Sequence, residues 1–191
     1  MTFKEKRNLK KLKKVLKSGD YSVRTDVFKE INKIVMGEEA FNLILQYSMH
    51  DPEPIVRAKA VYALGGYGEQ TVPLMKLMYE QGDENARASV AASLGQIGSA
   101  ATPLLINMLT DDSGHVVHDA AFSLVQIKDA KGLNALLERA KFSHYRATIC
   151  MALGEYGDVS AVDVLSDAVK YGEKHGVRHD AASSLGKIGH I

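Results

Sequence analysis

The sequence predicts an all-α fold, a right-handed superhelical solenoid of six helix pairs. The first observation behind this prediction is a pattern that begins Val-Arg and ends Leu-Gly-x-x-Gly, or a close variant. Its second residue stands at positions 24, 57, 87, 117, 146 and 178 of the 191-residue chain. The second is the helical spacing of apolar residues, at three and four, between these copies. A period of about 30 residues indicates stacked units that bury their apolar faces only against neighbours.

The six copies of the pattern are predicted to be the second helices of the pairs. They read VRTDVFKEINKIV (23–35), VRAKAVYALGGYG (56–68), ARASVAASLGQIG (86–98), VVHDAAFSLVQIK (116–128), YRATICMALGEYG (145–157) and VRHDAASSLGKIG (177–189). The first helices are predicted in segments 3–17, 40–49, 71–80, 101–110, 132–140 and 161–169. The repeats then span about 3–36, 38–68, 70–98, 101–128, 130–157 and 159–190, as a single domain over 1–191.

Prolines and acidic residues mark the expected helix starts. Pro73 and Pro103 fall at first-turn positions, where the missing amide hydrogen costs nothing. The inter-helix turns begin with side chains that accept hydrogen bonds from first-turn amides, so they are expected to supply N-caps. These residues are Asp20, Asp51, Asp83 and Asp112.

Two sets of glycines repeat with the pattern. One set follows the apolar position that recurs in the repeats, where a missing Cβ lets the next helix approach closely. These are Gly65, Gly95, Gly154 and Gly186. The other set stands at the helix end, where a left-handed C-cap is expected. These are Gly68, Gly98, Gly157 and Gly189.

Charge is unevenly distributed, although the net charge is only +1. Residues 1–19 carry eight basic side chains against Glu5 alone. This segment could bind nucleic acid or an anionic surface. The preferred interpretation is a capping helix, since Leu9, Leu12 and Leu16 follow helical spacing and leave the lysines to face water.

The remaining bulk properties indicate an ordinary protein of the cytoplasm. No apolar run is long enough to span a membrane, and the start of the chain lacks the apolar core of a secretory signal. The single cysteine, Cys150, cannot form an internal disulfide and is expected to be a small buried residue.

The repeats keep an apolar residue at one register, namely Ile31, Leu64, Leu94, Leu124, Leu153 and Leu185. Together with the Val-Arg pairs, they resemble the HEAT-like family, in the short variety also seen in phycobilin lyase subunits and deoxyhypusine hydroxylase. The resemblance covers nearly the whole chain. It implies that each arginine pairs with an aspartate of the next turn, in a ladder that Val117 interrupts.

The same resemblance implies a working surface. In that family the Arg-bearing helices line the concave side, and the exposed positions flank the Val-Arg pair. The expected face, which also includes Thr25, consists of Tyr21, Asp26, Ile55, Lys59, Tyr62, Asn85, Gln96, His115, His118, Asp119, Phe122, His144, Met151, Glu155, His175, His179 and Asp180. Five of the seven histidines of the chain fall on it.

Histidines next to carboxylates raise a metal hypothesis. The pairs His118-Asp119 and His179-Asp180 resemble the His-Glu pairs of deoxyhypusine hydroxylase, which bind two irons. Here the acid is one methylene shorter and only two pairs exist, with His144 as the residue that could bridge between them. A polar binding surface without metal is the preferred interpretation.

Motifs of other catalytic classes do not occur in the sequence. It has no Gly-x-Ser-x-Gly elbow, no Walker phosphate loop, no Cys-x-x-Cys and no His-Glu-x-x-His. The first prediction is therefore a non-catalytic scaffold that binds a protein partner on the concave face, with no cofactor and no small-molecule substrate. The alternatives are a metal-binding protein or metal-dependent enzyme that uses the His/Asp patch, and an adaptor for nucleic acid or anionic surfaces.

Overall fold

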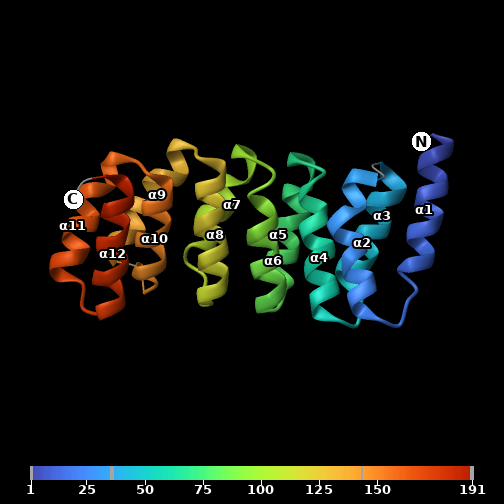
Figure 1. The fold of residues 1–191 in the computed structure, drawn as a ribbon, viewed down its shortest axis with the longest axis horizontal. Coiled ribbons are helices and arrows are strands. Elements are labelled where there is room, and N and C mark those ends of the chain that lie inside the picture. Colours follow the sequence, from blue (N-terminus) through green and yellow to red (C-terminus); the bar gives the residue numbers. More distant parts are fainter. Residues whose placement is uncertain (1, 35–36, 143, 190–191) are drawn as a thin grey trace. The chain divides into compact units, whose positions relative to one another are not determined.

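The computed structural model describes residues 2–34, 37–142 and 144–189. Within these ranges it contains twelve α-helices and no β-strand, so the predicted all-α solenoid of helix pairs is confirmed (Figure 1). The chain divides into two compact units, residues 1–97 and 98–191, which are described separately below. The break falls at the end of the third predicted repeat.

The first unit contains three helix pairs. They are α1 (Phe3–Val15) with α2 (Tyr21–Ile34), α3 (Glu38–His50) with α4 (Pro54–Gly65), and α5 (Val72–Gln81) with α6 (Glu84–Leu94). A short 3-10 helix, η1 (Glu69–Thr71), leads into α5. The second helices α2, α4 and α6 pack in a row, and each also packs against its own partner.

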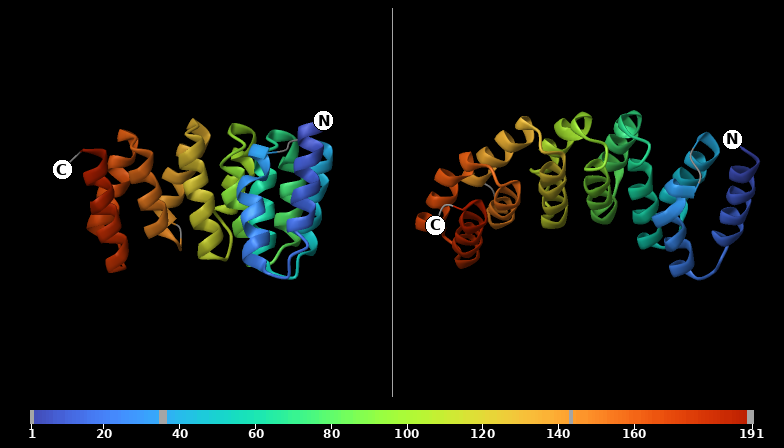
Figure 2. Two further views of the ribbon diagram at one scale, coloured as in Figure 1. Left: turned by 45° about the vertical axis from the view of Figure 1, so that its right-hand side comes forward. Right: turned by 45° about the horizontal axis from the view of Figure 1, so that its top comes forward.

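The second unit repeats this arrangement. Its pairs are α7 (Thr102–Met108) with α8 (Gly114–Ile127), α9 (Ala130–Phe142) with α10 (Arg146–Tyr156), and α11 (Val162–Tyr171) with α12 (His175–Ile188). The 3-10 helices η2 (Ser99–Ala101) and η3 (Val159–Ala161) precede α7 and α11. One layer is α8, α10 and α12, and the other is α7, α9 and α11 (Figure 2).

The repeated apolar register forms the core of each unit. Ile31, Leu64 and Leu94 are fully buried, as are Leu124 and Leu153 in the second unit. Leu185, at the same register in α12, is partly exposed. Helix α12 packs mainly on α10 and α11, so one side of its apolar register has less cover.

Helix α1 shows how the basic segment packs. Thr2 and Glu5 form a capping box at its start, and Leu9 and Leu16 are buried, Leu9 against Ala40 of α3. The lysines of this helix are exposed. The arrangement matches the predicted capping helix, with apolar residues inward and charges in water.

The close-approach prediction is confirmed at Gly65 and Gly154, whereas the predicted left-handed C-cap is found at only two of its four glycines. A Cβ on Gly65 would lie 2.6 Å from the Ser93 carbonyl oxygen, and one on Gly154 would lie 2.5 Å from Ser184 Oγ. Gly68 and Gly98 have positive φ, 77° and 92°, but with ψ near −160° they begin the 3-10 helices η1 and η2 and do not cap α4 and α6. Gly157 and Gly189 are left-handed C-caps of α10 and α12, with φ of 75° and 84°. The fourth repeat has Lys128 at this register, and it takes the same conformation, with φ of 55°.

The predicted caps are only partly correct. Asp83 accepts a hydrogen bond from the amide of Ala86, and Asp20 accepts one from the amide of Ser22. At the start of α8, however, the cap is Ser113, whose hydroxyl accepts from Val116, so the prediction that Asp112 caps this helix is wrong. Serine and aspartate are both favoured N-caps, and adjacent candidates cannot be separated by composition.

The arginine ladder exists in the first unit. Nε and Nη2 of Arg24 donate to the two carboxylate oxygens of Asp51 at 2.8 and 2.9 Å. Arg57 and Asp83 make a looser pair at 3.8 Å. The hydrogen bonds that Arg24 donates to the Asp51 carboxylate are the largest cause that raises the pKa of the guanidinium, and burial opposes this shift.

The sequence pattern did not indicate a second role of these arginines. Nη1 of Arg24 donates to the carbonyl oxygens of Ser18 and Gly19, six and five residues earlier. Arg57 and Arg178 bind the carbonyls at the same two offsets in their own turns. Each of these three arginines therefore ties the end of one helix to the start of the next.

Candidate binding surfaces

The face of the α8–α10–α12 layer carries the most chemically distinctive side chains of the second unit. On α8 the imidazole of His118 stacks on Phe122, with ring centroids 4.5 Å apart, and its Nδ1 lies 3.1 Å from Asp119 Oδ1. On α12, Nδ1 of His179 lies 3.1 Å from Asp180 Oδ1. The two His-Asp pairs thus have the same local geometry on two helices of one layer.

Between these helices, α10 contributes the remaining residues of this face. Glu155 is exposed and pairs with Lys187 of α12 at 2.5 Å, while Met151 is partly exposed. His115 and His175 are exposed in the first turns of α8 and α12. The face therefore combines exposed imidazoles, carboxylates and some apolar area.

His144 contributes to a pocket at the helix turns. It sits in the turn between α9 and α10, with its ring edge-on to Tyr145, and lines a pocket with Arg146 and Lys174. Among the described residues, no group of three or more His, Cys, Asp or Glu side chains is placed to hold a metal ion. The geometry therefore gives no support to convergence of His118, Asp119 and His144 on one metal.

In the first unit, most residues expected on the face are accessible. Tyr21, Ile55 and Tyr62 are about half exposed, and Asn85 and Gln96 are also exposed. Asp26 is exposed and pairs with Lys29, whereas Lys59 is partly buried. Gln96 donates to the carbonyl of Tyr62, which links α6 to α4.

One expectation for this face is wrong. Thr25 is buried, and its hydroxyl donates to the carbonyl oxygen of Tyr21 within α2. A threonine can satisfy its hydroxyl on its own helix in this way, so its polarity did not predict exposure.

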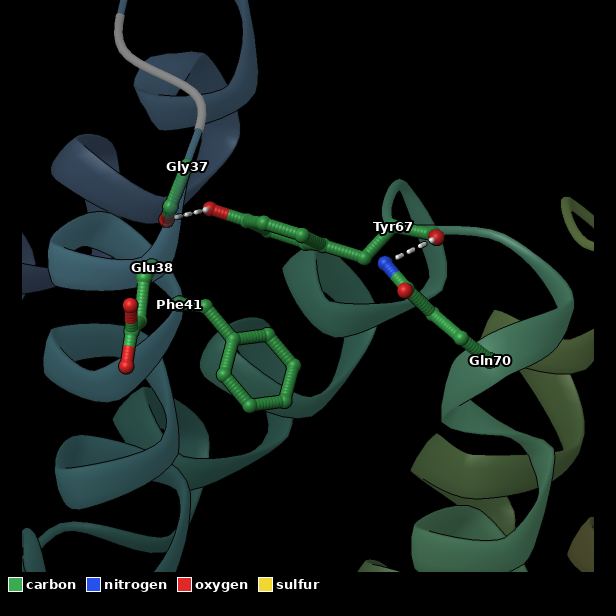
Figure 3. Close-up of a pocket in the computed structure, with 5 residues that line it drawn as sticks. All are labelled: Gly37, Glu38, Phe41, Tyr67 and Gln70. Atoms are coloured by element: carbon green, nitrogen blue, oxygen red, sulfur yellow. Dashed lines mark hydrogen bonds between the residues drawn. The ribbon is translucent and has the colours of Figure 1, made fainter. Parts of the chain in front are cut away.

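Pocket geometry was not visible in the sequence. A pocket of about 540 Å³ opens in the first unit, lined by Gly37, Glu38, Phe41, Tyr67 and Gln70 (Figure 3). The Tyr67 and Phe41 rings pack edge to face at 5.1 Å, and the Tyr67 hydroxyl donates to the Gly37 carbonyl at 3.4 Å. Burial raises the pKa of Tyr67, so the phenol stays protonated as a donor.

A second pocket, of about 310 Å³, lies in the second unit at the turns that join α9 to α10 and α11 to α12. The lining holds three cationic side chains, Lys141, Arg146 and Lys174, and the imidazole of His144, and Glu173 is its one acid among the described residues. Phe142, Tyr171 and Val177 complete the lining.

The lone thiol is unsuited to nucleophilic chemistry. Cys150 is fully buried, as predicted, and burial raises its pKa to about 11. A neutral, inaccessible thiol is a poor nucleophile.

The sequence profile of HEAT repeats matches residues 41–125, 71–145 and 130–190, most of the chain. The protein belongs to the HEAT-repeat family. In this HEAT-repeat protein, the repeats are held together by packed helix pairs, the repeated leucine and, in the first unit, the arginine–aspartate ladder. No curated protein is significantly similar to it in sequence.

Solved structures show similar folds. In the complex of CpcE and CpcF of phycocyanin lyase from Nostoc sp. PCC7120, the matched chain is 20% identical, with a TM-score of 0.57 over 82% of this HEAT-repeat chain and 67% of the other. Human deoxyhypusine hydroxylase is 12% identical, with a TM-score of 0.47 over 94% and 84%. At such identities the likeness concerns the fold alone. None of the described helices is long and apolar enough to cross a membrane.

Proposed function

We propose that this HEAT-repeat protein binds a protein partner on the face of the α8–α10–α12 layer. The observation that supports the proposal most is the pair of exposed His-Asp units on α8 and α12, with partly exposed Phe122 and Met151 on the same layer. Aromatic and methionine side chains beside polar groups are typical of protein interfaces.

The chemistry of this face favours recognition over catalysis. His118 and His179 are engaged by adjacent carboxylates, and the acid Glu155 is paired with Lys187. These groups lie along three helices and do not converge on one point, as a reacting atom would require. An extended polar surface of this kind matches how helical solenoids bind partners.

Site-specific photocrosslinking tests the proposal. A photoreactive amino acid at position 179 is expected to capture a specific protein, whereas the same residue at the exposed position 163 on α11 is the matched control. The captured protein is then purified and its affinity measured. A His118→Ala/His179→Ala double variant should bind it at least about tenfold more weakly, since a few central residues dominate interface energies.

The affinity measurement has a control double variant on the opposite layer of the same unit. Lys131→Ala/Asp163→Ala changes exposed residues of the α7–α9–α11 layer and should leave the affinity unchanged. Capture at position 163 in place of 179, or equal affinity for both double variants, would show that the working surface is elsewhere.

A further inference from the structure

Gly172, in the turn before α12, occupies the place that Asp51 has before α4. Each is the C-cap of the first helix of its pair, with φ and ψ of −65° and 135° at Asp51 and −63° and 120° at Gly172. Each stands six residues before an arginine, and Nη1 of Arg57 or Arg178 donates to its carbonyl oxygen. The two turns are therefore equivalent, but one lacks the carboxylate.

The loss of that carboxylate affects the arginine of the preceding repeat. In the first unit, Asp51 neutralises Arg24 through Nε and Nη2. Arg146 is the corresponding arginine before the Gly172 turn. Its Nε is buried and has no hydrogen-bond partner among the described residues. A buried donor without a partner costs free energy that a ligand can recover.

Arg146 lines an accessible pocket. The cavity of about 310 Å³ at these turns is bounded by Arg146 together with Lys141, His144 and Lys174, and Glu173 is its one acid. Glu173 forms no ion pair within 4 Å of Arg146 among the described contacts, and its carbonyl accepts a bond from Arg178. The pocket therefore has more cationic than acidic side chains, beside a guanidinium whose buried Nε has no partner.

We propose that this pocket binds a carboxylate group, which takes the place that Asp51 fills in the first unit. A guanidinium presents two parallel N–H donors that match a planar carboxylate, and this favours carboxylate over spherical anions. Lys174 adds positive charge to the lining, while Lys141 is already paired with Glu138 at 2.7 Å. The inference does not depend on the partner surface proposed above, because small carboxylates alone can test it.

The experiment uses the full chain labelled with ¹⁵N-arginine and follows the Nε–Hε resonances by NMR at constant ionic strength. The Arg146 signal is assigned by its loss in Arg146→Lys. The probes are sodium acetate, the peptide Ac-Gly-Glu-Gly-NH2, the peptide Ac-Gly-Gly-Gly-OH, inorganic phosphate, and the neutral control Ac-Gly-Gln-Gly-NH2. The three carboxylate probes distinguish a free acid, a side chain and a chain terminus.

The Arg146 signal should shift saturably with carboxylate probes, while the Arg24 signal, already held by Asp51, should not move. Binding followed through other resonances should be about tenfold weaker or more in Arg146→Lys, which keeps the charge but loses the fork. Arg139→Lys, an exposed change on α9, should have no effect.

Three results would overturn the proposal: an Arg146 signal that no carboxylate moves, a signal that phosphate alone moves, or undiminished binding by a folded Arg146→Lys protein. If that variant does not fold, the Arg146 signal is assigned by elimination, through lysine substitutions of the other arginines such as Arg139→Lys, and the titration of the wild-type signal decides.

Discussion

Arg24 and Asp51 form a buried two-point ion pair that joins the first repeat to the second. The side chains are 8% and 2% exposed, and both carboxylate oxygens accept hydrogen bonds from one guanidinium. The Asp51 side chain also accepts from the amide of Glu53, and its backbone carbonyl accepts from Arg57. One turn thus fixes two arginines of consecutive repeats.

Asp51→Asn should lower the thermal midpoint clearly, because it leaves a buried guanidinium without its charge partner. Asp83→Asn is the matched change at the looser pair, where the aspartate side chain is 61% exposed and 3.8 Å from Arg57. It should have a much smaller effect, as exposed ion pairs contribute little. Thermal unfolding of both variants checks this, and equal losses would contradict it.

Leu94→Ala should destabilise the first unit by about 2–5 kcal/mol, the usual range for truncating a buried leucine. Leu94 is fully buried at the repeated register of α6. Leu77→Ala, at a position that is 48% exposed on α5, is the control and should have little effect. Denaturant unfolding measures both changes, and a midpoint for Leu94→Ala that matches the control would show that this register is not the core.

Gly154→Ala should be destabilising, because the new methyl would lie 2.8 Å or less from several atoms of Ser184 and push α10 from α12. Gly176→Ala makes the same chemical change in α12 at a site with no atom within 4 Å. That control should be neutral or stabilising by up to about 1 kcal/mol, as alanine favours helix. Chemical denaturation of the pair provides the comparison. Two variants of equal stability would be inconsistent with close packing at Gly154.

Lys128→Gly should stabilise the second unit by a few tenths to about 1 kcal/mol. Lys128 has a left-handed backbone with φ of 55°, which costs a residue with a Cβ about 1–2 kcal/mol. Glycine removes this cost, but its larger loss of conformational entropy on folding offsets part of the gain. The reverse change, Gly157→Lys at φ of 75°, should destabilise. Urea unfolding of the two variants should therefore shift in opposite directions, and a shared direction would refute the assignment.

The pH dependence of stability should contain a contribution from Cys150. Its folded pKa, about 11, is above the value of 9.0 expected for an exposed thiol. The unfolded chain therefore loses its thiol proton first, so this contribution is complete below about pH 9 and is lost as the pH rises from 9 to 11. The unfolding free energy of wild type minus that of Cys150→Ala should fall as the pH rises through this range. A constant difference between the two proteins would contradict the burial effect.

The repeat period and the helical spacing were enough to predict the fold, because every unit repeats the same packing. The leucine register, the close approach at Gly65 and Gly154 and the burial of Cys150 also followed from local chemistry. The left-handed C-cap did so only at Gly157 and Gly189, because a 3-10 helix follows Gly68 and Gly98. Thr25 and Asp112 did not, since a hydroxyl can bond inside its own helix and neighbouring polar residues compete for one cap.

The pockets could not be predicted for a different reason. The equivalence of Gly172 and Asp51 becomes clear only when the two turns are compared in three dimensions. Likewise, the packing of Tyr67 on Phe41 depends on the path between α3 and α5. Both are properties of how repeats pack, which a pattern of single residues does not contain.

The bonds from Nη1 of Arg24, Arg57 and Arg178 to the carbonyls six residues earlier begin and end inside a single repeat. A helix pair that is moved to another place therefore keeps the arginine–carbonyl hydrogen bonds that close its own turn. Such a unit is suited to duplication or transplantation as a cassette, since the closure of its turn does not depend on the neighbouring repeats. Gene duplication could lengthen an array of these cassettes without redesigning any turn, and protein engineers could recombine them by the same rule.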